Sequence, residues 1–284
     1  MNRAALLLGT GVLSLALSAC GGQSLVGDEP QGDAGSDASS TSSAWACLGQ
    51  GSVAPTMAQI TVAVTAFNGL DAVTFTGQVD GGSDLTLASD TAFPGLMVLA
   101  CNALDSACAS PLATGTTDSN GLASLAVAGN FSGTFRLNGA GAVPTILWLG
   151  ALPAGATTFR APVPILETQG LSALEAALDT SPGSTLGHVF FEVYDCFDQL
   201  AAGVAVAPSA SLGTEAVAWY AANNLPSATA TETAATGNGG ILNASPGAVS
   251  LTATLAGSST TVGTANVVVE AQTITNVFFR ARAH

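Results

Sequence analysis

The hydrophobic positions of the chain fall into short runs, separated by stretches rich in Gly, Pro, Asp, Asn and Ser. Short runs with β-branched and aromatic residues predict strands, and the polar stretches between them predict turns. The strands predicted in the first half are Ile60–Phe67, Leu85–Ala88, Gly95–Cys101, Leu122–Ala126, Gly133–Leu137 and Thr145–Leu149. Those predicted in the second half are His188–Cys196, Gly203–Val206, Glu215–Ala221, Gly240–Leu242, Ala248–Leu255, Ala265–Glu270 and Thr273–Arg280.

The segment between the two sets of strands has a helical pattern. Leu171, Leu174 and Leu178 are spaced as i, i+3 and i+7 among good helix formers, which predicts one short helix. Because no long helices alternate with the strands, the pattern predicts an all-β fold rather than α/β. We expect two antiparallel Ig-like or transthyretin-like β-sandwiches, at residues 45–166 and 187–284, joined by a short helix and linker at 167–186.

The N-terminus is typical of a secretory signal. Arg3 precedes the apolar run Ala4–Ala19, and small residues stand before Cys20, which predicts a signal peptide over residues 1–19. The run is shorter than the roughly 20 apolar residues of a spanning helix. Leu17-Ser18-Ala19-Cys20 resembles a bacterial lipobox, and this resemblance implies cleavage before Cys20 and lipidation of that residue. In that family, Asp directly after the lipidated cysteine retains the protein in the inner membrane. Gly21 stands at this position here, which implies the outer membrane. The alternative is an ordinary signal peptide with a chance cysteine.

The residues that follow are predicted to form a tether. Residues 21–43 hold mainly Gly, Asp, Ser, Gln and Pro, and such a composition cannot bury enough apolar surface to order itself. Residues 20–44 therefore form a lipidated, flexible segment in this interpretation. Trp45-Ala46-Cys47-Leu48 is the first place where the chain would dock onto a core.

The charge of the chain limits its partners. All five basic residues are Arg and there are 19 acidic residues, so the net charge is −14, and it becomes −15 when Arg3 leaves with the signal. Such a chain cannot neutralise many phosphates, so no nucleic-acid partner is predicted. Anionic lipid head groups would repel it, which favours a domain held off the membrane by its anchor.

Four cysteines remain for the folded part: Cys47, Cys101, Cys108 and Cys196. An even number in an exported chain predicts disulfides, and four cysteines allow three pairings. Cys101 and Cys108 are close in sequence and are the favoured pair, which leaves Cys47 with Cys196. Buried reduced thiols are the alternative.

The sequence offers little for metal or catalytic chemistry. His188 and His284 are the only histidines and the cysteine spacings lack a repeated C-x-x-C, so no metal or other cofactor is predicted. Ser119 lies in a turn without the strand–elbow–helix context of a nucleophile, and no enzyme is predicted. The acidic turns near Asp71 and Asp80–Asp84 leave calcium binding open, although they lack the spacing of a known calcium loop.

Three aromatic residues are candidates for ligand binding. Trp148 and the pair Trp219-Tyr220 lie in predicted strands, and exposed rings there would stack on sugars. Neighbouring strand residues face opposite ways, so one of Trp219 and Tyr220 points outward if that strand is regular. Packing in the core is the favoured interpretation for each ring.

The second half carries short glycine-based motifs. They are Asp195-Cys196, Ala202–Val206, Ala218–Tyr220, Thr236–Ile241 and Asn243–Gly247. With these motifs, residues 188–279 resemble a carboxypeptidase regulatory-like domain, which is a transthyretin-like sandwich. Val249 departs from that family, because the position is usually aromatic. Thr116–Leu122 and Gly133–Phe135 make the first half resemble a divergent copy, as in tandem β-sandwich lipoproteins of myxobacteria and similar Gram-negative bacteria.

These observations predict a membrane-anchored lipoprotein of the cell envelope with a non-enzymatic structural or binding role. The resemblance carries no catalytic residue over to this chain. The alternative is a carbohydrate-binding module of a surface polysaccharide system. An unidentified envelope protein or glycan is the expected partner, beside the membrane itself.

Overall fold

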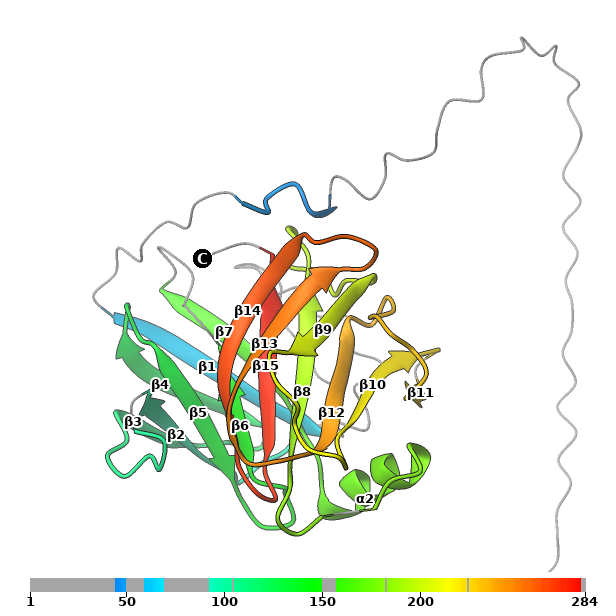
Figure 1. The fold of residues 1–284 in the computed structure, drawn as a ribbon. Helices are drawn as coiled ribbons and strands as arrows, with labels where there is room; N and C mark the ends of the chain where they lie inside the picture. Colours follow the sequence, from blue (N-terminus) through cyan, green and yellow to red (C-terminus); the bar gives the residue numbers. More distant parts are fainter. Residues whose placement is uncertain are drawn as a thin grey trace, which may run out of the picture. The chain divides into compact units, whose positions relative to one another are not determined.

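The computed structural model describes residues 44–49, 59–68, 92–103, 105–149, 157–181, 183–223 and 225–281. Within these ranges the chain forms fifteen strands and the helix α2 (Thr168–Ala177), so the all-β prediction is confirmed (Figure 1). The helix lies where the leucine spacing predicts it. In the same ranges, no helix has the length and the apolar character needed to span a membrane.

The largest sheet among the described residues has nine strands. They are β2 (Met97–Asn102), β3 (Ala113–Thr116), β5 (Gly133–Asn138), β6 (Thr145–Trp148), β8 (Gly187–Tyr194), β10 (Val217–Ala222), β11 (Leu225–Ser227), β12 (Asn238–Ala244) and β15 (Ile274–Arg280). Their order is β11-β10-β12-β8-β15-β6-β5-β2-β3. Strands from both predicted sandwiches thus share one sheet, joined where β15 pairs with β6. The division into two sandwich domains, at residues 45–166 and 187–284, stays a prediction.

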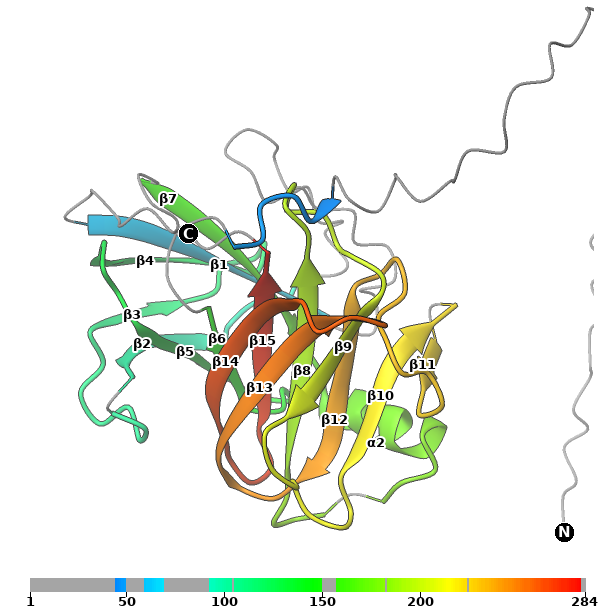
Figure 2. The ribbon, with the colours of Figure 1, turned by 45° about the horizontal axis from the view of Figure 1, so that its top comes forward.

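Two three-stranded sheets complete the described part. One holds β4 (Leu122–Ala128), β1 (Gln59–Asn68) and β7 (Thr158–Ile165), in that order. The other holds β14 (Thr261–Val269), β13 (Gly247–Leu255) and β9 (Val204–Pro208), in that order. Figure 2 shows β9, β13 and β14 layered over β8, β12 and β15 of the large sheet.

Two of the three sheets are mixed, which corrects the prediction of wholly antiparallel sandwiches, whereas the sheet of β14, β13 and β9 is antiparallel throughout. β15 runs parallel to both β8 and β6, and β1 runs parallel to β7. Parallel neighbours require a crossover connection, whereas antiparallel neighbours are joined by a tight turn. The short spacing of strands and turns in the sequence suggested only the second arrangement.

Several local predictions are confirmed. The turn before β4 is built on Asp118, whose Oδ1 accepts hydrogen bonds from the backbone N–H groups of Asn120 and Leu122 at 2.8 and 3.0 Å. Gly121 follows with a φ of 72°, a conformation that glycine adopts without steric cost. The predicted strand Leu85–Ala88 lies outside the described residues, and β3, β7 and β11 were not predicted.

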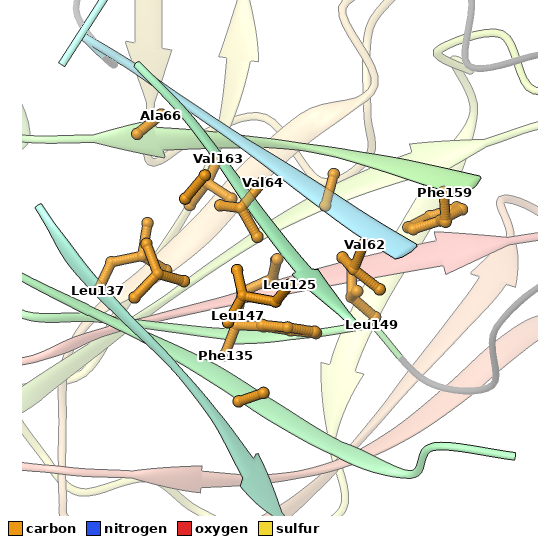
Figure 3. Packing of buried hydrophobic residues seen from close by; sticks show 14 of the residues in the cluster. Val62, Val64, Ala66, Leu125, Phe135, Leu137, Leu147, Leu149, Phe159 and Val163 are labelled. Atoms are coloured by element: carbon orange, nitrogen blue, oxygen red, sulfur yellow. The ribbon is translucent and has the colours of Figure 1, made fainter. Parts of the chain in front are cut away.

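Three hydrophobic clusters lie between these layers. The first joins β1, β4 and β7 to β5 and β6 around Phe135 and Leu147 (Figure 3). The second packs β9, β13 and β14 against one face of β8 and β15. In the third, Leu171 and Leu174 of α2 pack against Phe190, Trp219 and Leu242 of the large sheet. The large sheet is therefore covered on both faces around β8.

Candidate functional site

The candidate site lies on the α2 face of the large sheet. Side chains alternate along β8, so Val189, Phe191 and Val193 enter the cluster shared with β9, β13 and β14. Phe190 and Glu192 stand on the other face. Glu192 is a charged residue within an apolar strand, so its environment decides what this face can do.

A cavity of about 180 Å³ opens beside these residues. It lies between the cluster under α2, to which Phe190 and Trp219 belong, and the first cluster, to which Phe278 belongs. Leu174 of α2 and Leu225 of β11 add further apolar walls. The cavity is thus a concave, mainly apolar site of the kind that binds small molecules.

Four polar residues interrupt the apolar lining: Glu192, Thr236, Asn238 and Asn276. Asn238 is the register partner of Glu192 across β12 and β8, and Glu192 is the partner of Phe278 across β8 and β15. Thr236 stands two residues before β12 starts. The pairing of three strands therefore places Asn238, Glu192 and Phe278 in one row across the sheet.

Three lining residues carry a buried polar atom that has no hydrogen-bond partner among the described residues. They are Trp219 Nε1, Thr236 Oγ1 and Asn238 Oδ1. A buried polar atom left without a partner costs about 1–3 kcal/mol. Such atoms in the wall of a cavity indicate a place where a ligand with polar groups would gain affinity.

Glu192 belongs to a small charged network. The Tyr194 hydroxyl donates a hydrogen bond to Glu192 Oε2. Burial raises the pKa of the Glu192 carboxyl, while the Tyr194 hydrogen bond and the positive charge of Arg280 oppose this rise. Burial, and after it the charge of Glu192, holds the pKa of Tyr194 well above its usual range, so Tyr194 stays protonated and donates.

Arg280 forms an ion pair with Asp198, and its buried Nη2 has no hydrogen-bond partner among the described residues. Its Nη1 lies 3.0 Å from Asp198 Oδ1, and both side chains are largely buried. Its guanidinium carbon lies 4.5 Å from the centre of the Tyr194 ring. Glu192 makes no ion pair with the described residues, although the positive charge of Arg280 acts to lower the pKa of its carboxyl.

The four predicted disulfide cysteines are joined in the favoured pairing. Cys101 and Cys108 form a local disulfide, with a Cα–Cα distance of 5.2 Å. Cys47 and Cys196 form the second, with a Cα–Cα distance of 5.7 Å, and it ties residues 44–49 to the end of β8. The backbone N–H of Cys196 also donates to the carbonyl of Ala44 at 2.9 Å.

The three aromatic candidates do not form an exposed row. Trp219 is 8% exposed and Tyr220 is 5% exposed, because both faces of their strand are covered. Trp148 is half-buried against the cluster around β13 and β14. Of the three, Trp219 alone lines the cavity, and it packs edge-on against Phe190 with ring centres 5.5 Å apart.

His188 is not placed as a catalytic base. It is 3% exposed, and its Nδ1 accepts the backbone N–H of Asn243 at 3.4 Å. Burial lowers the pKa of His188 to about 4, so the ring is neutral at pH 7. Ser119 lies exposed in the turn before β4.

Other predicted site residues lie outside the described part of the chain. These are the lipidation residue Cys20, the second histidine His284 and the acidic turn residues Asp71, Asp80 and Asp84. Within the described ranges, no three His, Cys, Asp or Glu side chains come together as a metal site.

Sequence reasoning missed the cavity residues Glu192, Thr236, Asn238 and Asn276. One signal was available, because Glu192 is a lone acid among the apolar residues of Val189–Tyr194. Thr236 and Asn238 belong to the glycine-based motif Thr236–Ile241, which by itself gives no sign of a cavity. Their convergence depends on the pairing of β12 with β8, which the sequence does not reveal.

No protein-family model matches the chain, and no curated protein matches it. Among solved structures it is similar to the shaft pilin SpaA from Lactobacillus rhamnosus GG, at 13% identity over 81% of this chain and 99% of the pilin, with a TM-score of 0.23. It is also similar to GBS52, a minor pilin of Streptococcus agalactiae, at 14% identity over 78% of this chain and 94% of that one, with a TM-score of 0.24.

A third similar structure is the Bacillus anthracis TIE protein, at 12% identity with a TM-score of 0.25. The match covers 78% of this chain and spans about a third, 34%, of that protein's structure. Likeness at this level of identity and TM-score carries no argument about function, and no family is assigned from it.

Proposed function

We propose that this protein is a lipoprotein of the bacterial cell envelope, anchored through Cys20 and held in the outer membrane, with a non-enzymatic binding role. The lipobox Leu17–Cys20 supports the anchor. The two disulfides are in keeping with an exported chain, because disulfides persist in oxidising compartments. The single observation that carries the binding role is the cavity beside Glu192, with its unpartnered polar atoms.

A carbohydrate-binding module is the alternative. Sugar recognition on a sheet uses an exposed row of aromatic rings, and Trp148, Trp219 and Tyr220 do not form one. Hits on a glycan array, lost on substitution of an exposed ring, would favour the alternative. The non-enzymatic role predicts no labelling by activity probes for serine or cysteine hydrolases.

The anchor is tested by membrane fractionation of the Cys20→Ser variant. We expect this variant to leave the membrane fraction and to lose incorporation of a fatty-acid analogue. The matched control is the double variant Cys101→Ser/Cys108→Ser, which removes two other cysteines and keeps Cys20. Membrane retention of Cys20→Ser, with the control also retained, would contradict lipid anchoring at this residue.

A further inference from the structure

We propose that the cavity beside Glu192 binds a small organic cation, namely an ammonium group carried on a single ring or a short apolar chain. This inference rests on the proposed binding role and adds the chemical class of the ligand.

The cavity sets the size and the apolar part of the ligand. Its volume is about 180 Å³, and a dry cavity of about 150 Å³ is known to hold a benzene ring, whereas drug-sized ligands occupy roughly 300 Å³ or more. Leu174, Phe190, Trp219, Leu225 and Phe278 provide apolar walls. A single ring or a chain of a few carbons therefore fits this volume.

The charge of the site selects a cation. Arg280 and Asp198 form an ion pair at 3.0 Å, whereas Glu192 makes no ion pair with the described residues. A buried carboxylate is stabilised by a partner that is both charged and hydrogen-bonded to it. An ammonium group provides both.

The neighbouring groups also suit an ammonium donor. Asn238 Oδ1 and Thr236 Oγ1 have no hydrogen-bond partner among the described residues, and both accept hydrogen bonds. Asn238 is the register partner of Glu192 on the neighbouring strand β12. Trp219, Phe190 and Phe278 also line the cavity, and a ring that turns its face to a cation attracts it.

Other ligand classes fit less well. An anion would be repelled by Glu192, and a sugar would leave most of its hydroxyl groups against apolar walls without partners. The whole chain is also acidic, with a net charge of −14, so its field raises the local concentration of cations. The acidic charge of the chain and the residues that line the cavity thus both favour an organic cation as the ligand.

The test compares three probes with the same phenylethyl group by titration calorimetry with the mature protein in detergent. The probes are 2-phenylethylammonium, the neutral 2-phenylethanol and the anionic 3-phenylpropionate. We expect the ammonium ion to bind at least about tenfold more tightly than the alcohol, since a hydrogen bond to a charged group adds this much, and the carboxylate not to bind. The indole N–H resonance of Trp219, identified with Trp219→Phe, should shift on binding.

Three variants locate the binding. Glu192→Gln should lower the affinity for the ammonium ion at least about tenfold and leave that for the alcohol unchanged. Glu215→Gln removes one acid from an exposed position and is the matched control, with no expected change. Ala221→Leu places a larger side chain in the cavity wall and should abolish binding of both probes while Glu192 is retained. Thermal unfolding of each variant establishes that it is folded.

The outcomes separate this inference from the proposed function. Equal affinity for the ammonium ion and the alcohol, unchanged in Glu192→Gln, would overturn the cation class and keep a binding cavity. Failure of all three probes to bind the folded wild-type protein would overturn the cavity as a binding site. Neither result bears on the lipid anchor, which Cys20→Ser tests separately.

Discussion

The indole ring of Trp219 lies directly over Gly240, its register partner on the neighbouring strand β12. A Cβ atom at Gly240 would come within 2.7 Å of Trp219 Nε1 and within 2.6 Å of the Val189 carbonyl oxygen. The missing side chain thus makes room for the ring that forms one wall of the cavity. The glycine is required by close approach rather than by its backbone angles.

Gly240→Ala is expected to destabilise the protein by about 1–3 kcal/mol, because the added methyl group overlaps both a ring and a backbone oxygen. Chemical denaturation followed by circular dichroism measures this change. The matched control is Gly115→Ala in β3, where the nearest atom to an added Cβ lies 3.6 Å away. Glycine in a strand costs about 0.5–1 kcal/mol relative to alanine, so the control should be neutral or stabilising. Equal effects in the two variants would contradict the close approach.

The sequence was sufficient to predict most strands, because their hydrophobic runs are short and bounded by turn residues. It was misleading for β7, where Pro162 and Pro164 argue against a strand. β7 lies at the edge of its sheet beside β1, and an edge strand tolerates proline because one side of its backbone needs no ladder hydrogen bonds. Whether a strand lies at the edge of a sheet depends on the order of the strands in the folded protein. The local sequence of β7 does not contain this information.

The candidate site was harder to predict than the fold. The alternation of Trp219 and Tyr220 suggests one outward ring, yet both are buried, since α2 covers one face of β10 and the cluster around β13 covers the other. In that interior, the Tyr220 hydroxyl oxygen accepts a hydrogen bond from the backbone N–H of Val206 at 2.9 Å. The cavity itself depends on β8, β12 and β15 lying side by side. The pattern of hydrophobic and polar residues within each strand does not predict which strands become neighbours.

The two disulfides are expected to differ in their effect on stability. The sequence separation is 149 for Cys47–Cys196 and 7 for Cys101–Cys108. In the chain-entropy model, closing the longer loop is worth about 5 kcal/mol and closing the shorter about 2.5 kcal/mol. The double variant Cys47→Ser/Cys196→Ser should therefore lose more unfolding free energy than Cys101→Ser/Cys108→Ser. Each double variant serves as the control for the other, and the reverse order would contradict the prediction.

Glu175 is predicted to destabilise the folded state at neutral pH. It is 1% exposed on α2, and neither carboxylate oxygen has a hydrogen-bond partner among the described residues. We expect Glu175→Met to raise the unfolding free energy at pH 7 by about 1–3 kcal/mol, because it removes an unpartnered buried polar group. Glu167→Gln, at the exposed N-terminus of the same helix, is the control and should be neutral or slightly destabilising.

The gain from Glu175→Met should depend on pH. Burial raises the pKa of Glu175 in the folded state, so the folded chain holds this proton at a pH where the unfolded chain has lost it. The wild-type protein therefore loses stability as pH rises from the unfolded pKa through the raised folded pKa. The advantage of the variant should shrink when the pH is lowered through that window. An advantage that does not vary with pH would show that the carboxyl charge is not its cause.

His188 should make the protein less stable in mild acid. The unfolded chain takes up a proton at His188 near pH 6.5, whereas the folded chain does so only near pH 4. Between these values the unfolded state binds more protons, so stability is present above pH 6.5 and is lost as the pH falls towards 4, by up to about 3 kcal/mol. Urea unfolding at a series of pH values measures this slope. His188→Gln should flatten it over that range, and His284→Gln, which keeps His188, should not. A slope that persists unchanged in His188→Gln would assign the acid sensitivity to other groups.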